Sequence, residues 1–254
     1  GTGAINLTAG IIRATTSANA LGTGTASLSL SGATTVLQLA NDTALNFARN
    51  TTVSAATTIT ADRLTSAATS TTHTLGTLTI GAQTLSITRG SNITTTGIGG
   101  ITFGSVTQTG AAIFDVGASA TLTLGALQTT GQNITKQGTG TIVLGTAANA
   151  LRVAGSNTLT AGTMRLGSVS ALGTTGATLV LNGGTLDLAT DTTVNAYNTT
   201  VGGATTISSN KATASSAGIT HTLGTLSISA QTLNVTRGGN ATSGTGTITF
   251  GATT

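Results

Sequence analysis

Histidine and aspartate are the residues of this sequence whose side chains could do acid–base or metal chemistry, and there are few of them. The chain has two histidines, His73 and His221, and five acidic residues, all of them Asp. A neutral imidazole can serve as a general base or as a metal ligand. The two histidines occupy equivalent positions of an internal repeat, so each lacks the other as a partner, and a metal site needs several converging ligands. We therefore predict that both lie in turns or at the surface.

Asp187 and Asp191 are the best candidates for a catalytic pair. Enzymes that cleave polysaccharides on a β-helix gather carboxylates on adjacent rungs, a rung being one circuit of the chain, and use them as acid and base. These two residues lie four positions apart on a single predicted rung, and the sequence contains no Glu. Solvated strand and turn positions account for both. We predict no catalytic, cofactor-binding or metal-binding residue, and no enzymatic activity.

The composition of the 254-residue chain narrows its structural class. Charged residues make up 6% of it and aromatic residues 2%, with no Pro and no Cys. An ordinary soluble domain is about one quarter charged. Regularly spaced Leu, Ile and Val favour a folded chain over a disordered one, and a core with so few aromatic residues is thin and aliphatic. We expect the aromatic side chains to fill that interior: Phe47, Phe103, Phe114, Phe250 and Tyr197.

The basic residues are scattered, although the net charge is +4. Scattered charge is not the footprint of a nucleic-acid-binding protein. We expect four of these residues to keep outer faces soluble and to resist sideways sheet pairing: Lys136, Arg165, Arg89 and Arg237. No apolar run approaches the roughly 18 residues that span a bilayer. The first four residues do not begin a signal peptide, so we expect the targeting segment of an exported protein to lie outside this sequence.

An internal repeat of about 150 residues is the strongest pattern in the sequence. Residues 73–80 recur as residues 221–228, an offset of 221 − 73 = 148. Residues 83–90 recur at the same offset as residues 231–238. Such self-similarity is typical of solenoids and other repeat folds. The chain therefore holds about 1.7 copies, a first copy over residues 1–151 and a partial second copy over residues 152–254.

Apolar-x-apolar triplets with a polar middle residue mark a shorter period. Leu78-Thr-Ile80 and Leu122-Thr-Leu124 are examples, and alternation places the outer two residues of each triplet on one face of a strand. Markers of this kind recur with gaps of 19–23 residues: Leu37, Ile59, Leu78, Ile101, Leu122, Ile142, Met164, Leu186, Ile207, Leu226 and Ile248. The long repeat therefore divides into seven short ones.

A period of about 21 residues with several short strand signals predicts an all-β fold, a right-handed parallel β-helix (β-solenoid) of about 12 rungs. Helices are disfavoured because Thr, Ser and Gly are poor helix formers and the 3.6-residue periodicity is missing. One rung buries too little apolar surface to offset an ordering cost of about 1–2 kcal/mol per residue, so the rungs have to stack. We predict one continuous solenoid over residues 1–254.

The segment from Lys136 to Leu144, Lys-Gln-Gly-Thr-Gly-Thr-Ile-Val-Leu, opens a pattern that continues through residues 159–167, 171–173 and 183–188. This pattern resembles the autotransporter-associated β-strand repeat. It covers residues 134–188, with a weaker echo at 8–39, and departs from the family at residues 151–157, where a Tyr-Thr-Gly-Gly-Thr-like stretch is common. The resemblance implies an exported β-helix at the bacterial cell surface and supplies no catalytic residues.

These observations favour a structural function. We expect a repeat segment of a secreted bacterial cell-surface protein or extracellular fibre, which acts as a rigid shaft. Its partners would be copies of itself or adjacent repeats stacked head to tail, with no nucleic acid, no membrane crossing, and host or environmental surfaces as a further class. Residues 1–10 and 245–254 carry no capping helix, so we expect the repeat to continue at both ends.

The rival class is an adhesin or surface-binding module. Outward threonines such as Thr79 and Thr102 could present an array to a glycan or to ice. The middle residues of the triplets vary among Thr, Ser, Arg, Val, Asp and Asn, so we expect that array to be broken. Adhesion to a host remains an alternative.

Overall fold

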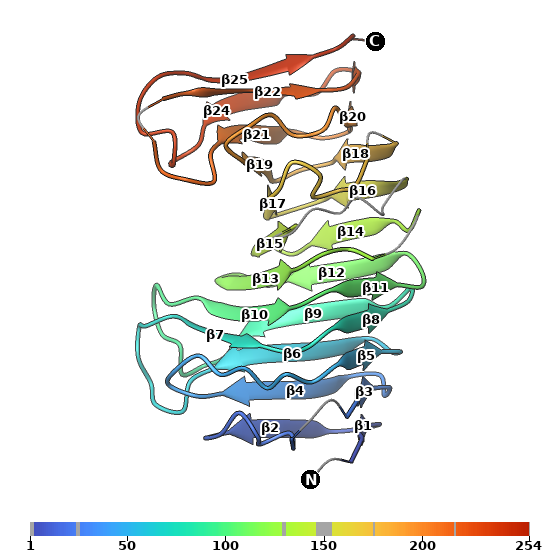
Figure 1. Ribbon diagram of the computed structural model, residues 1–254, viewed down its shortest axis with the longest axis vertical. Helices are drawn as coiled ribbons and strands as arrows, with labels where there is room; N and C mark the ends of the chain where they lie inside the picture. The colour runs from blue at the N-terminus through green and yellow to red at the C-terminus, as the bar shows by residue number, and fades with distance from the viewer. Residues whose placement is uncertain are drawn as a thin grey trace. The chain divides into compact units, whose positions relative to one another are not determined.

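The computed structural model describes residues 3–23, 26–128, 131–145, 154–174, 176–215 and 217–253, and these residues form strands and connections with no helix. The chain divides into two compact units: Gly1–Gly125 with Gly138–Thr141, and Ala126–Gln137 with Ile142–Thr254. Each unit is a parallel β-solenoid (Figure 1). The predicted fold class is confirmed. The predicted junction between copies, at residues 151 and 152, lies outside the described residues.

The first unit has three parallel sheets. Sheet A contains β1 (Ile5–Leu7), β3 (Leu28–Leu30), β5 (Thr51–Val53), β8 (Leu78–Ile80) and β11 (Val106–Gln108). Sheet B contains β2 (Ile11–Thr15), β4 (Thr35–Ala40), β6 (Thr57–Asp62), β9 (Thr84–Arg89) and β12 (Ala112–Val116). Sheet C contains β7 (Thr71–Thr74), β10 (Gly99–Phe103) and β13 (Ala120–Leu124).

The second unit has three corresponding sheets. Sheet D contains β14 (Ile134–Gln137), β16 (Gly155–Leu159), β18 (Ala177–Leu181), β20 (Asn198–Val201) and β23 (Leu226–Ile228). Sheet E contains β15 (Thr141–Leu144), β17 (Thr163–Leu166), β19 (Thr185–Ala189), β21 (Thr205–Asn210) and β24 (Leu233–Arg237). Sheet F contains β22 (Ile219–Leu223) and β25 (Gly246–Phe250). The internal repeat makes sheets D, E and F equivalent to A, B and C.

Rungs of two lengths replace the single predicted period. Thr35 of β4 pairs with Thr57 of β6, a rung of 22 residues, whereas Thr57 pairs with Leu85 of β9, a rung of 28 residues. The longer rung contains three strands because it adds one to sheet C. The triplet markers therefore lie in different sheets, Ile59 in B and Leu78 in A, and their spacing is not the length of a rung. Sheets B and E contribute five strands each, so the described residues form about ten rungs.

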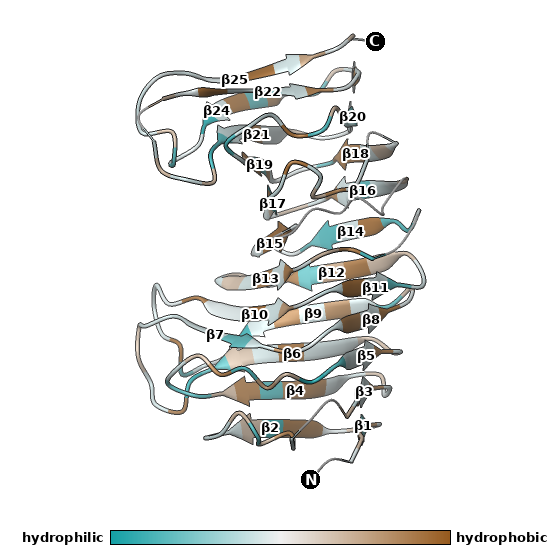
Figure 2. Ribbon diagram, in the orientation of Figure 1, coloured by the Kyte–Doolittle hydropathy of each residue, from teal (hydrophilic) through white to brown (hydrophobic). Residues whose placement is uncertain are grey.

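Alternation along each strand separates core from surface, as predicted. Leu122 and Leu124 of β13 are fully buried, and Thr123 between them is partly exposed. Figure 2 shows the same alternation as brown and teal bands along β4. The predicted aromatic fillers are buried apart from Phe250, which is partly exposed.

Candidate functional site

Both histidines lie inside the solenoid, and the prediction of a turn or surface position is wrong. His73 of β7 and His221 of β22 have no exposed surface. His73 pairs in register with Ile101 of β10, so its side chain occupies an inward row of the strand. Its Nε2 lies 3.0 Å from the carbonyl oxygen of Asp62, and Nε2 of His221 lies 2.9 Å from that of Asn210. Each imidazole therefore satisfies a backbone carbonyl at the end of the preceding long strand.

Hydrogen bonding identifies the protonation state of His73. The backbone N–H of Leu45 donates to Nδ1 at 3.3 Å, so Nε2 carries the proton and donates to the Asp62 carbonyl. Burial lowers the pKa of His73 below its ordinary value of 6.5, and the carbonyl and charge of Asp62 offset part of that effect. Burial likewise lowers the pKa of His221. Both rings are held as neutral imidazoles.

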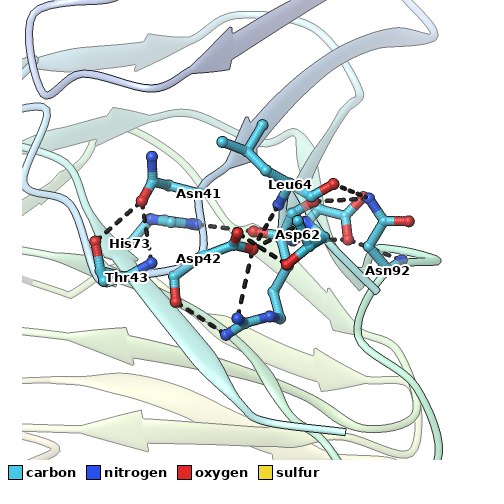
Figure 3. A network of polar contacts seen from close by, with 9 residues as sticks. Asn41, Asp42, Thr43, Asp62, Leu64, His73 and Asn92 are labelled. Carbon is cyan, nitrogen blue, oxygen red and sulfur yellow. Dashed lines mark hydrogen bonds and ion pairs between the residues drawn. The ribbon is translucent and has the colours of Figure 1, made fainter. Parts of the chain in front are cut away.

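The carboxylate of Asp62 is the centre of a polar network in the first unit (Figure 3). Oδ1 accepts the backbone N–H groups of Arg63 at 2.8 Å and of Asn92 at 3.0 Å. Oδ2 accepts Nε2 of Gln38 at 2.8 Å. Asp62 is buried, and these three donors replace the water that the charged group loses.

Asp42 and Asn92 fix the loop that follows β6. Asp42 accepts the backbone N–H groups of Leu64 at 3.0 Å and Thr65 at 2.9 Å, and it forms an ion pair with Arg63 at 3.4 Å. The hydrogen bond from the Thr65 backbone is the main reason why the pKa of Asp42 is lowered. Asn92 Nδ2 donates to the carbonyls of Arg63 and Leu64. The network therefore binds two successive loops to the solenoid.

The second unit repeats this network around Asn210. Its Oδ1 accepts the backbone N–H groups of Lys211 at 2.9 Å and of Asn240 at 3.0 Å. Asp191 accepts the backbone N–H of Thr213 at 3.2 Å, which lowers the pKa of Asp191. Asp191 is exposed in a turn, as predicted. In both units the stabilised loops project beside the third sheet (Figure 1).

A carboxylate and an amide have exchanged places between the two units. In the first unit Gln38 is the amide and Asp62 the carboxylate. In the second, Asn210 Nδ2 donates to the carboxylate of Asp187 at 2.9 Å. Asp187 also accepts Nη1 of Arg165 at 2.9 Å. Asp187 is 8% exposed, so the prediction that it is solvated is wrong.

Lys136 also differs from its predicted outer position. It is fully buried, because its place in β14 puts it in the same inward row as Ile134. Its Nζ donates to the carbonyls of Gln137 at 2.6 Å and Ala161 at 3.2 Å. Arg237 is exposed as predicted, whereas Arg89 and Arg165 are half-buried.

The signal that sequence reasoning missed is positional. His73 stands two residues before the buried Leu75, so alternation places both side chains inward. The recurrence of the histidine at position 221, eleven residues after Asn210 as His73 follows Asp62, pointed to a shared structural contact.

The chemistry of these networks is structural in what the structure describes. No group of three or more His, Cys, Asp or Glu among the described residues could hold a metal ion. No helix long and apolar enough to cross a membrane occurs in the described ranges. No protein-family model, curated protein or solved structure matches the sequence.

The two buried imidazoles predict that stability falls in mild acid. Their folded pKa values lie below the ordinary 6.5, so the unfolded chain takes up protons first as the pH drops below about 6.5. We expect urea denaturation to show a lower free energy of unfolding at pH 5 than at pH 7. Asp42 and Asp191 titrate below their ordinary 3.8, outside this window. A variant with His73→Gln and His221→Gln should show a much weaker dependence, and an unchanged one would contradict the assignment.

The exchanged pair predicts a compensating double substitution. Asn210→Asp places a second carboxylate against Asp187, where both positions are less than 10% exposed, and we expect it to lower the free energy of unfolding by about 2–4 kcal/mol at pH 7. Adding Asp187→Asn recreates the order found in the first unit and should restore most of the loss. Thermal and urea denaturation of the two single variants and the double variant measure the coupling. Purely additive effects would show that the residues do not interact.

Proposed function

We propose that this chain is a structural repeat segment of a secreted bacterial cell-surface protein or extracellular fibre, and that its rungs act as a rigid shaft stacked end to end. The resemblance of residues 134–188 to the autotransporter-associated β-strand repeat supports the extracellular, cell-surface location. The buried polar side chains support a structural role, because they hold loops and strands together rather than converge on an open cavity.

The observation that carries the proposal is the behaviour of an uncovered rung. Ile87 of β9 is 0% exposed, because β12 lies against it on the next rung. Its repeat equivalent, Val235 of β24, occupies the same inward row and is 47% exposed. Phe103 and its equivalent Phe250 differ in the same direction. Inward rows therefore need a rung on both sides, which adjacent repeats or another copy of the chain would supply.

End-to-end stacking predicts fibres that depend on this inward row. We expect concentrated protein to form thin filaments in negative-stain electron microscopy, with larger species in sedimentation velocity. Val235→Glu puts a charge into the row that a stacked rung covers, so it should abolish the filaments. Asn234→Glu is the matched control, because Asn234 is the neighbouring outward residue and its change should leave assembly intact. Monomers at all concentrations, or equal effects of the two variants, would contradict stacking.

A second candidate function rests on the outward face of sheet A. Its register aligns the outward hydroxyl residues Ser29, Thr52, Thr79 and Thr107 on four successive rungs, about 4.8 Å apart. The charged middle residues of the triplets lie elsewhere, for example Asp115 in sheet B. The expectation of a broken array is therefore wrong for this face. An uncharged hydroxyl row supports binding to a regular surface such as ice or an insoluble glycan.

Substitution at the centre of that row tests the second function. We expect Thr79→Lys to reduce the fraction of protein that partitions into growing ice or sediments with insoluble polysaccharide, because the bulky charge interrupts the row. Thr102→Lys, at an outward position of sheet C, is the control and should bind like the unmodified chain. Absence of binding by the unmodified chain to either surface would exclude this function.

A further inference from the structure

Arg49 is a buried cation with unused hydrogen-bond donors. Its side chain is 1% exposed, and Nη1 donates to the carbonyl of Ala26 at 2.8 Å. Within the described part of the chain, Nε and Nη2 have no hydrogen-bond partner, and neither of the two ion pairs there includes Arg49. A buried guanidinium without a counter-charge is costly. The position therefore calls for an anion.

A small pocket of about 280 Å³ lies beside this guanidinium in the first unit. Its other lining residues are small or aliphatic: Gly3, Ile5, Ala20, Leu21 and Gly22. Nε and Nη2 form one edge of the planar guanidinium, and that edge can donate two parallel hydrogen bonds to the two oxygens of a carboxylate. Neither nitrogen has exposed surface of its own, so a ligand reaches them through a small outward movement of the pocket wall.

The second unit shows the same place closed by an uncharged side chain. Tyr197 is the repeat equivalent of Arg49, at an offset of 148 residues. Its hydroxyl donates to the carbonyl of Gly173 at 3.0 Å and accepts the backbone N–H of Leu172 at 3.3 Å. These two residues correspond to Leu21 and Gly22 of the pocket. The phenol thus seals the turn to which the Arg49 side chain makes no hydrogen bond.

We propose that the first unit binds a small monocarboxylate at this pocket, with its two oxygens on Nε and Nη2 of Arg49 and a short aliphatic tail against Ile5 and Leu21. The aliphatic lining disfavours phosphate, which needs several donors. The volume limits the ligand to a few carbon atoms. Binding at this pocket is a function in addition to that of a shaft.

Butyrate is the probe for this site, with butanol and inorganic phosphate as controls. We titrate each into the full chain at pH 7 and follow the NMR signals of Arg49 Nε–H and of the Ile5 and Leu21 methyl groups. Butyrate should shift all three in a saturable way, and butanol should bind at least about ten-fold more weakly because it lacks the charge. Arg49→Tyr, which installs the residue of the second unit, should fold with an unchanged melting temperature and lose the binding. Arg49→Lys should weaken it about ten-fold, because a lysine cannot form the paired hydrogen bonds.

Several outcomes would overturn the proposal. They are shifts that do not saturate, equal binding of butanol or phosphate, or butyrate binding that survives in both Arg49 variants. Sedimentation velocity separates a second source of the same chemistry. If Arg49→Tyr reduces self-association while butyrate does not bind, the anion is a carboxylate of another copy of the chain, and binding of a free acid is excluded.

Discussion

Burial of each rung between two others is the constraint on which the rest of the structure depends. The inward rows are one side chain wide, so a residue such as Leu37 or Ile59 loses contact with water only when the neighbouring rungs cover it. The same stacking pairs the backbone groups of each strand, which a rung alone would leave unsatisfied. Stability in such a fold is a property of neighbouring rungs rather than of one rung.

The same constraint explains how polar residues enter the interior. Lys136 and His73 reach backbone carbonyls on adjacent segments, and Asp62 is satisfied by three donors. Each inward polar group is thus paired with a partner from another part of the winding. These hydrogen bonds specify how rungs of two and three strands follow one another, because they lie where the long strands end and the additional loops begin.

The alternation of residues such as Leu122-Thr-Leu124 was enough to predict strands, a parallel solenoid and most of its aliphatic core. Rung length could not be predicted in this way, because the same triplet occurs in every sheet and its spacing mixes them. Residue type misplaced His73, Lys136 and Asp187, since chemistry suggested the surface while position in the strand decided for the interior. The network around Asp62 joins residues about 30 positions apart, such as Asn92, and no local pattern announces such a contact.

The exchange of amide and carboxylate between the two units limits how copies of the repeat can recombine. A crossover that falls between the strand carrying Asp187 and the strand carrying Asn210 would join one half of each pair. One hybrid would bring together Asp187 and Asp62, two carboxylates, and the reciprocal hybrid would bring together two amides. Crossovers outside the pair keep each match intact. Tandem copies of this kind are therefore inherited in blocks of at least two adjoining rungs, and the boundaries of duplication are set by side-chain charge as well as by sequence identity.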